Sequence, residues 1–294
     1  MSKPDIHGVI GYTITPFDDK GAVDLDALGK TIDRMIDYGV HAIAPLGSTG
    51  EGAYLSEDEW SDVAKYSVEH VAKRVPTIVS VSDLTTAGAV RRAKAAESFG
   101  ADVLMVLPAS YWKLQDNEVL EHYRAIGDAV KTPIMLYNNP GTAGIDMSVD
   151  LILRIIEDVD NVVMVKESTG DIQRMHQIYL RTKGSVPFYN GSNPMALEAF
   201  AAGASGWCTA APNLIPALNI KLYDAVREGR LEDAQSLFYR QLPFLDFILK
   251  LGLPKTIKAG LALDGLPVGT PRAPVQALDS AGKAELARML EELR

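Results

Sequence analysis

Eight short apolar runs recur along this 294-residue chain, and longer amphipathic segments separate them. Each run is followed by turn or helix-capping residues, which is typical of a buried parallel strand. The runs cover residues 9–15, 42–46, 77–81, 103–107, 134–137, 162–166, 186–190 and 206–209. Their starts lie roughly 20–35 residues apart, which leaves room for one helix after each strand. The pattern therefore predicts eight strand–helix units in succession.

Eight such units favour a parallel sheet that closes on itself, because closure removes both edge strands. We therefore predict an α/β fold, a (β/α)8 TIM barrel over residues 1–226, and the chain length suits one barrel with an appendage. Residues 227–294 lack strand patterns and are predicted to form a C-terminal helical extension packed on the barrel. The alternative is a doubly wound open sheet, which the absence of a glycine-rich nucleotide-binding turn disfavours.

Capping residues predict where the helices begin and end. Ser56 followed by Glu59 is a capping-box pattern, and Gly39 and Gly100 are candidate C-terminal caps. Further helix starts are predicted at Asp24, Thr85 or Thr86, Asn117, Ser148 and Asp171, and the helices of the extension at residues 232–250, 254–263 and 280–293.

The composition argues against several classes of function. A net charge of −9 disfavours nucleic acid or an anionic membrane as a partner. No apolar run approaches the roughly 20 residues that span a bilayer, and the first residues show no signal peptide, so the predicted location is the cytoplasm. Cys208 is the only cysteine, which excludes an intramolecular disulfide. The five histidines are scattered, so we expect no metal site.

Active sites of such barrels lie at the carboxyl ends of the strands, and Lys166 ends the sixth predicted strand. Strand alternation places it on one face with Val162 and Met164. If that face lines the barrel, burial favours the neutral amine, which is a nucleophile. The alternative is a lysine that reaches the rim or pairs with Glu167. Strand position alone leaves both readings open.

Two further strand ends carry candidate groups. Tyr137 ends the fifth strand, beside the sixth, where a phenol can transfer protons for a reactive amine; it can equally be an amphipathic tyrosine at the rim. The turn Gly47-Ser48-Thr49-Gly50-Glu51 offers backbone amides and two hydroxyls to a small carboxylate, although it can equally be a plain strand–helix turn. Cys208 lies in an apolar run and is read as a buried small hydrophobe.

Three motifs together resemble the dihydrodipicolinate synthase / N-acetylneuraminate lyase family, the class I pyruvate aldolases that form a Schiff base. They are Gly-Ser-Thr-Gly-Glu at 47–51, Tyr-Asn-Asn-Pro at 137–140 and Val-Lys-Glu-Ser-Thr-Gly at 165–170, in the order and spacing of that family. The resemblance extends from about Gly8 to the helical end of the chain. It implies a (β/α)8 barrel with a three-helix extension and a homotetrameric enzyme.

The resemblance also implies roles for individual residues. Lys166 would form the imine with a 2-oxo acid, so that no cofactor beyond this covalent imine is expected. Tyr137 would shuttle protons, with Thr49 linking it into a relay, and Ser48 and Thr49 would bind the carboxylate of the 2-oxo acid. Tyr111 matches a tyrosine that members often lend to the relay of a neighbouring subunit. Cys208 falls where a backbone carbonyl near the nucleophile is expected.

One departure from the family pattern bears on the substrate. Thr142 stands where true dihydrodipicolinate synthases carry an arginine for the carboxylate of aspartate semialdehyde, and losing that guanidinium weakens transition-state binding. Gly191, Ser192 and Asn193 follow the seventh strand and are predicted to line the substrate site, where Ser192 and Asn193 would bind sugar hydroxyls. The predicted function is therefore an aldolase or dehydratase acting on pyruvate or a 2-keto-3-deoxy sugar-acid-like 2-oxo acid.

Two alternatives remain. One is a 4-hydroxy-tetrahydrodipicolinate synthase, which condenses pyruvate with aspartate semialdehyde through a different carboxylate contact. The other is a non-catalytic protein that binds a 2-oxo acid. The presence of both Lys166 and Tyr137 argues against the second, because binding alone needs no nucleophile beside a proton shuttle.

Overall fold

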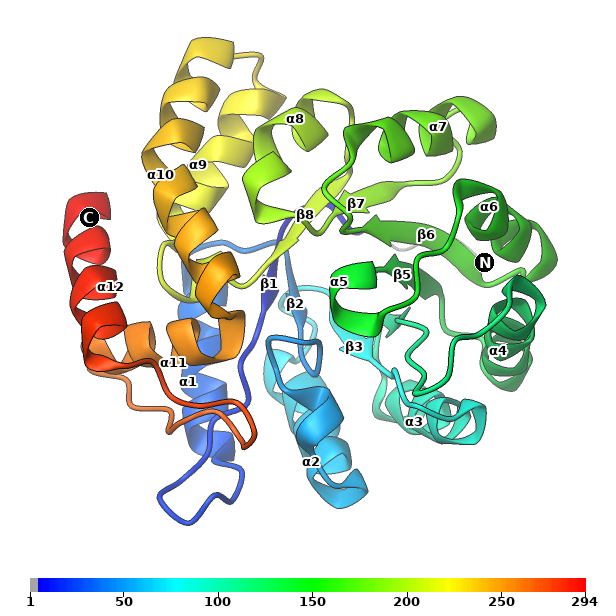
Figure 1. Ribbon diagram of the computed structural model, residues 1–294, viewed down its shortest axis with the longest axis horizontal. Helices are drawn as coiled ribbons and strands as arrows, with labels where there is room; N and C mark the ends of the chain where they lie inside the picture. Colours follow the sequence, from blue (N-terminus) through cyan, green and yellow to red (C-terminus); the bar gives the residue numbers. More distant parts are fainter. Residues whose placement is uncertain (1–4) are drawn as a thin grey trace.

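The computed structural model describes residues 5–294 and places eight parallel strands in one ring (Figure 1). Neighbouring strands follow the order β2-β1-β8-β7-β6-β5-β4-β3. A parallel bridge between Ile43 and Thr77 brings the two ends of this order together. The strands are β1 (Gly8–Tyr12), β2 (Ala42–Ala44), β3 (Ile78–Ser80), β4 (Val103–Val106), β5 (Ile134–Asn138), β6 (Val162–Glu167), β7 (Phe188–Asn190) and β8 (Gly206–Thr209). The predicted (β/α)8 barrel is confirmed, and the open doubly wound sheet is excluded.

Helices follow every strand and form an outer layer around the ring (Figure 1). These are α1 (Leu25–Asp37), α2 (Glu57–Val71), α3 (Thr86–Phe99), α4 (Asp116–Ala129), α6 (Val149–Asp158), α7 (Ile172–Thr182), α8 (Ala196–Ala201) and α9 (Pro216–Arg227). A four-residue helix, α5 (Pro140–Ala143), which was not expected from the sequence, follows β5 directly. Single 3₁₀ turns lie at Gly52–Tyr54, Asn193–Met195 and Ala211–Asn213.

The predicted helix starts are confirmed except for one. The Ser56 hydroxyl accepts from the Glu59 amide while the Glu59 carboxylate accepts from the Ser56 amide, so the capping box forms. The side chains of Asp24, Thr85, Ser148 and Asp171 each cap the helix that follows. The start predicted at Asn117 is wrong. The α4 helix begins at Asp116, because a capping box of Gln115 and Glu118 starts it earlier.

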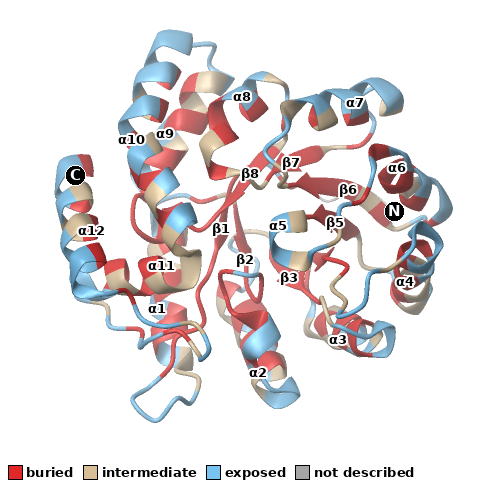
Figure 2. Ribbon diagram, viewed as in Figure 1, coloured by how far each residue is buried: buried red, intermediate tan, exposed pale blue. Residues whose placement is uncertain are grey.

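Two apolar cores lie on the two faces of the barrel wall, and the strands between them are almost entirely buried (Figure 2). One fills the space between strands and helices, and the other fills the barrel interior. Met164 belongs to the interior core, as strand alternation predicts, whereas Val162 belongs to the outer core. The prediction for Val162 is wrong because the β5–β6 register shifts between Ile134 and Met135, which adds one residue on β6 before Met164. Such a bulge reverses the alternation on its N-terminal side.

The C-terminal residues form three helices, α10 (Leu231–Leu251), α11 (Leu253–Leu263) and α12 (Ser280–Leu293), close to the predicted ranges. Figure 1 shows α10 beside α9, and α11 with α12 on the side of α1. The apolar side chains of α10 to α12 belong to the same outer core as the barrel helices. We retain the division into a barrel (1–226) and an extension (227–294) as a proposal. Within residues 5–294, no helix has the length and apolarity needed to cross a membrane.

The loop between α11 and α12 is attached to the barrel through Arg272. Its guanidinium binds both carboxylate oxygens of Glu59, at 2.6 and 2.8 Å. It also lies 4.3 Å from the ring centroid of Phe17. A bidentate pair of this kind combines charge with directed hydrogen bonds. The Arg272 guanidinium lowers the pKa of Glu59 to about 2, from an ordinary 4.5.

This pKa predicts an acid-dependent contribution to stability. A carboxylate whose pKa is lower in the folded state stabilises the fold above the unfolded pKa, and the contribution disappears as the pH falls from 4.5 to about 2. The Glu59→Gln variant retains a side chain that can form the capping box but lacks this charge. We expect the difference in unfolding free energy between wild type and Glu59→Gln to be largest near neutral pH and to shrink below pH 4.5 in urea titrations. A difference that stays constant down to pH 2 would contradict the assignment.

Candidate active site

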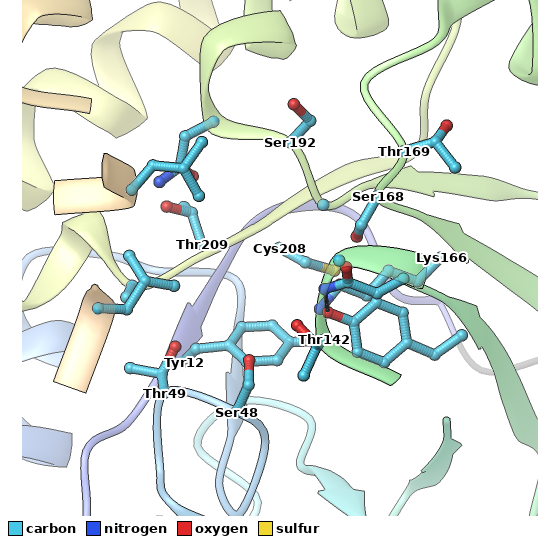
Figure 3. A pocket seen from close by; sticks show the side chains of 18 of the residues that line it. Tyr12, Ser48, Thr49, Thr142, Lys166, Ser168, Thr169, Ser192, Cys208 and Thr209 are labelled. Atoms are coloured by element: carbon cyan, nitrogen blue, oxygen red, sulfur yellow. Dashed lines mark hydrogen bonds between the residues drawn. The ribbon is translucent and has the colours of Figure 1, made fainter. Parts of the chain in front are cut away.

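A cavity of about 470 Å³ opens at the carboxyl ends of the strands (Figure 3). It collects nine of the ten predicted site residues, from the ends of β5, β6 and β8 and the segments after β2, β5 and β7. They are Ser48, Thr49, Tyr137, Thr142, Lys166, Gly191, Ser192, Asn193 and Cys208. Residues far apart in the sequence thus meet at the end of the barrel where the active sites of barrel enzymes lie.

Lys166 projects into this cavity from the interior face of β6. Its side chain is only 4% exposed, and its Nζ lies 3.7 Å from the ring centroid of Tyr137 and 4.1 Å from that of Tyr12. The next residue, Glu167, points away from the cavity and accepts from the Arg174 Nε at 2.9 Å. The reading in which Lys166 pairs with Glu167 is therefore wrong, and the interior reading is confirmed.

Tyr137 stands beside Lys166 because their strands pair in register at these two residues. The Asn139 side-chain amide donates to the Tyr137 hydroxyl at 2.7 Å. Since the amide is the donor, the phenol keeps its own proton for another acceptor. Thr49 is buried at the same cavity. No hydrogen bond between Thr49 and Tyr137 is present among residues 5–294, so the proposed relay through Thr49 stays a prediction.

The turn of residues 47–51 is tightly wound after β2. Leu46 before it and Glu51 at its end both have positive φ angles, 66° and 56°, which L-residues seldom adopt. A Cβ on Gly50 would lie 2.9 Å from the Leu46 amide nitrogen, so only glycine fits there. The Thr15 hydroxyl donates to the Gly50 carbonyl at 2.6 Å. In this turn Ser48 is exposed to the cavity and Thr49 is buried.

Gly191 makes room for two side chains from β6 and the loop after it. A Cβ at Gly191 would lie 1.7 Å from the Ser168 Oγ and 2.8 Å from the Lys166 Cε. The Ser168 Oγ is itself buried and has no hydrogen-bond partner within residues 5–294. Gly191 therefore leaves space for the side chains of Lys166 and Ser168, and its contact with substrate stays a prediction.

The remaining predicted residues occupy different parts of the cavity. Thr142 is exposed on α5, and Ser192 is half-buried opposite it. Asn193 is buried and its Oδ1 accepts a hydrogen bond from the Trp207 indole at 3.3 Å. This hydrogen bond is made within the fold and not to a substrate. Burial raises the pKa of the Cys208 thiol, although the charge of Lys166 opposes the shift. The thiol is therefore protonated at neutral pH, as the reading of a buried small side chain requires.

Tyr111 is the one predicted residue outside the cavity. It is 97% exposed on the loop between β4 and α4, next to Trp112, which is 78% exposed. Within its own chain it therefore cannot contribute to the group around Lys166. The predicted role toward a neighbouring subunit stays a prediction.

Several residues that line the cavity had been assigned no role from the sequence. Tyr12 was missed although it lies near the carboxyl end of the first predicted strand, whereas Asn139 and Ser168 lie at predicted strand ends and within two of the motifs but were given no function. The others are Pro140, Gly141, Thr169, Thr209, Ala210, Leu249, Leu253 and Pro254, of which the last three come from α10 and α11. No local pattern marks those three, because only the packing of the extension brings them to the barrel.

The electrostatics of the cavity are simple. Among the residues of 5–294 that line it, Lys166 carries the only cationic side chain, and no carboxylate is present. Hydroxyl groups are abundant, from Ser48, Thr49, Thr142, Ser168, Thr169, Ser192 and Thr209. No cluster of three or more histidine, cysteine or acidic side chains within residues 5–294 is placed to hold a metal ion.

Known proteins resemble the chain over nearly its whole length. The profile of the Dihydrodipicolinate synthetase family matches residues 5–293. The 4-hydroxy-tetrahydrodipicolinate synthase of Archaeoglobus fulgidus is 31% identical over 286 residues, covering 97% of this chain and 98% of the relative. A Pseudomonas aeruginosa structure provisionally named dihydrodipicolinate synthetase has a TM-score of 0.97 and 69% identity, covering 98% of this chain and all of its own. The Acinetobacter baumannii dihydrodipicolinate synthase, solved with pyruvate, has a TM-score of 0.94 and 29% identity, covering 98% and 99% of the two chains.

The steric role of Gly191 can be tested by one added methyl group. We expect Gly191→Ala to retain the fold, because the φ angle at this position is not positive, and to displace Lys166 and Ser168. Reactivity of the Lys166 amine toward pyruvate, measured by borohydride trapping, should fall by about 100-fold, since small displacements of a reacting group are that costly. Adding Ser168→Ala removes the closest contact and should restore part of the rate. Unchanged trapping in Gly191→Ala would refute the steric role.

Proposed function

The chain belongs to the dihydrodipicolinate synthetase family, and from this membership we propose that Lys166 forms its Schiff base with a 2-oxo acid. As a member, the chain is an enzyme of the class I aldolase type. The non-catalytic alternative is thereby set aside. The single observation that supports the assignment of Lys166 is its place in the cavity, with its amino group 3.7 Å from the ring of Tyr137.

The proposed chemistry proceeds through intermediates that are covalently bound to Lys166. The neutral Lys166 amine attacks the ketone carbon, and the carbinolamine loses water to give a protonated imine. This cation withdraws electrons from the neighbouring carbon, so that a proton or a carbon–carbon bond at that carbon can be cleaved to leave an enamine. Tyr137 supplies and removes the protons, since its hydroxyl already accepts a hydrogen bond from Asn139 and has its own proton to give.

The carboxylate of the 2-oxo acid is bound by the turn after β2. Ser48 and Thr49 line the cavity with hydroxyls, and the backbone amides of a tight turn form an anion site. The carboxylate would also lie close to the positive charge of the imine nitrogen. This placement leaves the other end of the substrate against Thr142 and Ser192.

We propose a hydroxylated 2-oxo acid, of the 2-keto-3-deoxy sugar-acid type, as the substrate. A second carboxylate requires a second cation or several amide donors, and Lys166 is the only cation among the residues of 5–294 that line the cavity. Hydroxyl-bearing side chains instead surround the site, and they suit substrate hydroxyls. In a dehydratase, the enamine expels a β-hydroxyl group as water. In an aldolase, the enamine forms when the neighbouring carbon–carbon bond is cleaved. The proposed enzyme is therefore a dehydratase or an aldolase.

The second candidate is a 4-hydroxy-tetrahydrodipicolinate synthase, and the names of the relatives favour it. Curated relatives of that name are 29–32% identical to this chain over nearly its full length. The same Lys166 enamine would attack the aldehyde of aspartate semialdehyde. The homotetramer and the cytoplasmic location remain predictions.

The covalent step predicts a stable adduct at Lys166. Incubation with pyruvate and borohydride should reduce the imine and add the mass of the reduced adduct to a peptide that contains Lys166. In Lys166→Ala the adduct should be absent while circular dichroism and thermal unfolding stay close to those of the wild type. An adduct on another lysine, with Lys166 unmodified, would reject the proposal.

The two substrate candidates predict opposite preferences. We expect kcat/KM for 2-keto-3-deoxygluconate-type acids to exceed that for pyruvate plus aspartate semialdehyde by at least about tenfold. Thr142→Arg adds a guanidinium at the place where synthases have one, and should raise the activity with the semialdehyde relative to wild type. Efficient condensation by the wild-type enzyme would instead establish the synthase.

A further inference from the structure

Glu51, the last residue of the turn at 47–51, points away from the cavity toward the C-terminal extension. It is 1% exposed and accepts from the Arg272 backbone amide at 2.7 Å. Its other carboxylate oxygen lies 2.6 Å from the Nζ of Lys258 on α11. A buried carboxylate held by two segments distant in sequence thus connects the turn to the extension.

Lys258 is as deeply buried as its partner, at 1% exposure. Its Nζ donates to the Thr270 carbonyl at 3.1 Å and lies 4.0 Å from the ring centroid of Phe17. Burial lowers the pKa of Lys258, and the hydrogen bond and charge of Glu51 oppose that shift. The ion pair therefore has no contact with bulk water, and no step of the proposed chemistry uses it.

Stabilisation of the fold does not by itself explain why a buried Glu51–Lys258 ion pair is present. Removing two charges from water costs about as much as their attraction returns, and apolar replacements of buried pairs are often neutral. Glu51 has a positive φ of 56°, an unfavourable backbone region that persists where surrounding contacts enforce it, and the ion pair with Lys258 is one such contact. Releasing the carboxylate permits the turn to relax, and with it the two residues just before Gly50.

The same helix also forms part of the cavity. The α11 helix begins with Leu253 and Pro254, which line the cavity, and carries Lys258 one turn later. The α11 helix therefore forms part of the apolar wall of the cavity and also contacts the turn of residues 47–51. This arrangement couples the position of the extension to the geometry of the substrate site.

We propose that Glu51 and Lys258 are positioning residues whose buried ion pair sets the turn so that Ser48 and Thr49 receive the carboxylate of the 2-oxo acid. The proposal rests on the function proposed above, in which that carboxylate binds at this turn. Neither residue contacts the substrate. Each acts through the backbone of residues 47–51.

The test separates positioning from folding by a pair of substitutions. Single variants Glu51→Gln and Lys258→Met leave one buried charge without a partner and should lower the melting temperature. The double variant Glu51→Gln/Lys258→Met leaves no such charge and should recover most of that loss. The readout is borohydride trapping of pyruvate as a function of its concentration, which gives a half-saturating concentration and a maximal rate separately.

In the stable double variant we expect the half-saturating pyruvate concentration to rise by about tenfold or more, because small errors in a positioned group are costly. The maximal trapping rate should stay near that of the wild type, since Lys166 and Tyr137 are untouched. Asp264→Asn is the matched control. It breaks the 2.6 Å ion pair between Asp264 and Arg34, which joins the extension to α1 away from the turn, and it should lower the melting temperature without changing pyruvate saturation.

Two results overturn the proposal. A double variant with wild-type stability and wild-type pyruvate saturation would show that the pair does not position the turn. A double variant that unfolds at the assay temperature would make the pair a requirement of the fold. Absence of any pyruvate adduct in the wild-type enzyme is a separate outcome, because it rejects the proposed function before the variants are compared.

Discussion

The proposed chemistry depends on a primary amine that is buried inside the barrel next to a phenol. Lys166 and Tyr137 belong to adjacent strands that pair in register, so the spacing of the sheet itself sets the distance between them. An amine on a loop would have no comparable restraint. The amine lies between two aromatic rings and is only 4% exposed, and the turn of residues 47–51 and the C-terminal helices line the same cavity. The reaction proposed at Lys166 therefore relies on backbone geometry more than on a network of charged neighbours.

Much of the fold and the centre of the site could be predicted from the sequence, because those features have a local physical origin. Short apolar runs followed by turn or capping residues marked the eight strands, and Ser56 with Glu59 marks a helix start through contacts three residues apart. Strand-end positions and three motifs likewise identified Lys166, Tyr137 and the turn. The predictions failed where an irregularity intervened. A bulge moved Val162 to the outer core, and an earlier capping box displaced the start expected at Asn117.

Other features could not be predicted, because they arise only from packing between distant segments. The sequence gives no sign that Leu253 and Pro254 line the cavity, or that Glu51 meets Lys258. The function of Gly191 is likewise a steric one, visible only once Ser168 and Lys166 lie against it. Motif comparison places such residues near a site but does not say what each one does there. The physical role follows from the neighbours, and the neighbours follow from the tertiary structure.

The closure of the barrel between β2 and β3 has a consequence for the dynamics of the substrate site. Elsewhere around the ring each pair of strands shares at least two ladder positions, but between β2 and β3 there is one ladder bridge, between Ile43 and Thr77, and one further backbone hydrogen bond, from Ser80 to Pro45. Backbone amides along this seam should exchange with deuterium sooner than those of β5 and β6, because fewer hydrogen bonds must open together. The turn of residues 47–51 follows β2, so it is attached to the part of the barrel wall where the fewest backbone hydrogen bonds must open together. The rigidity of this turn must therefore come from contacts with segments outside the sheet.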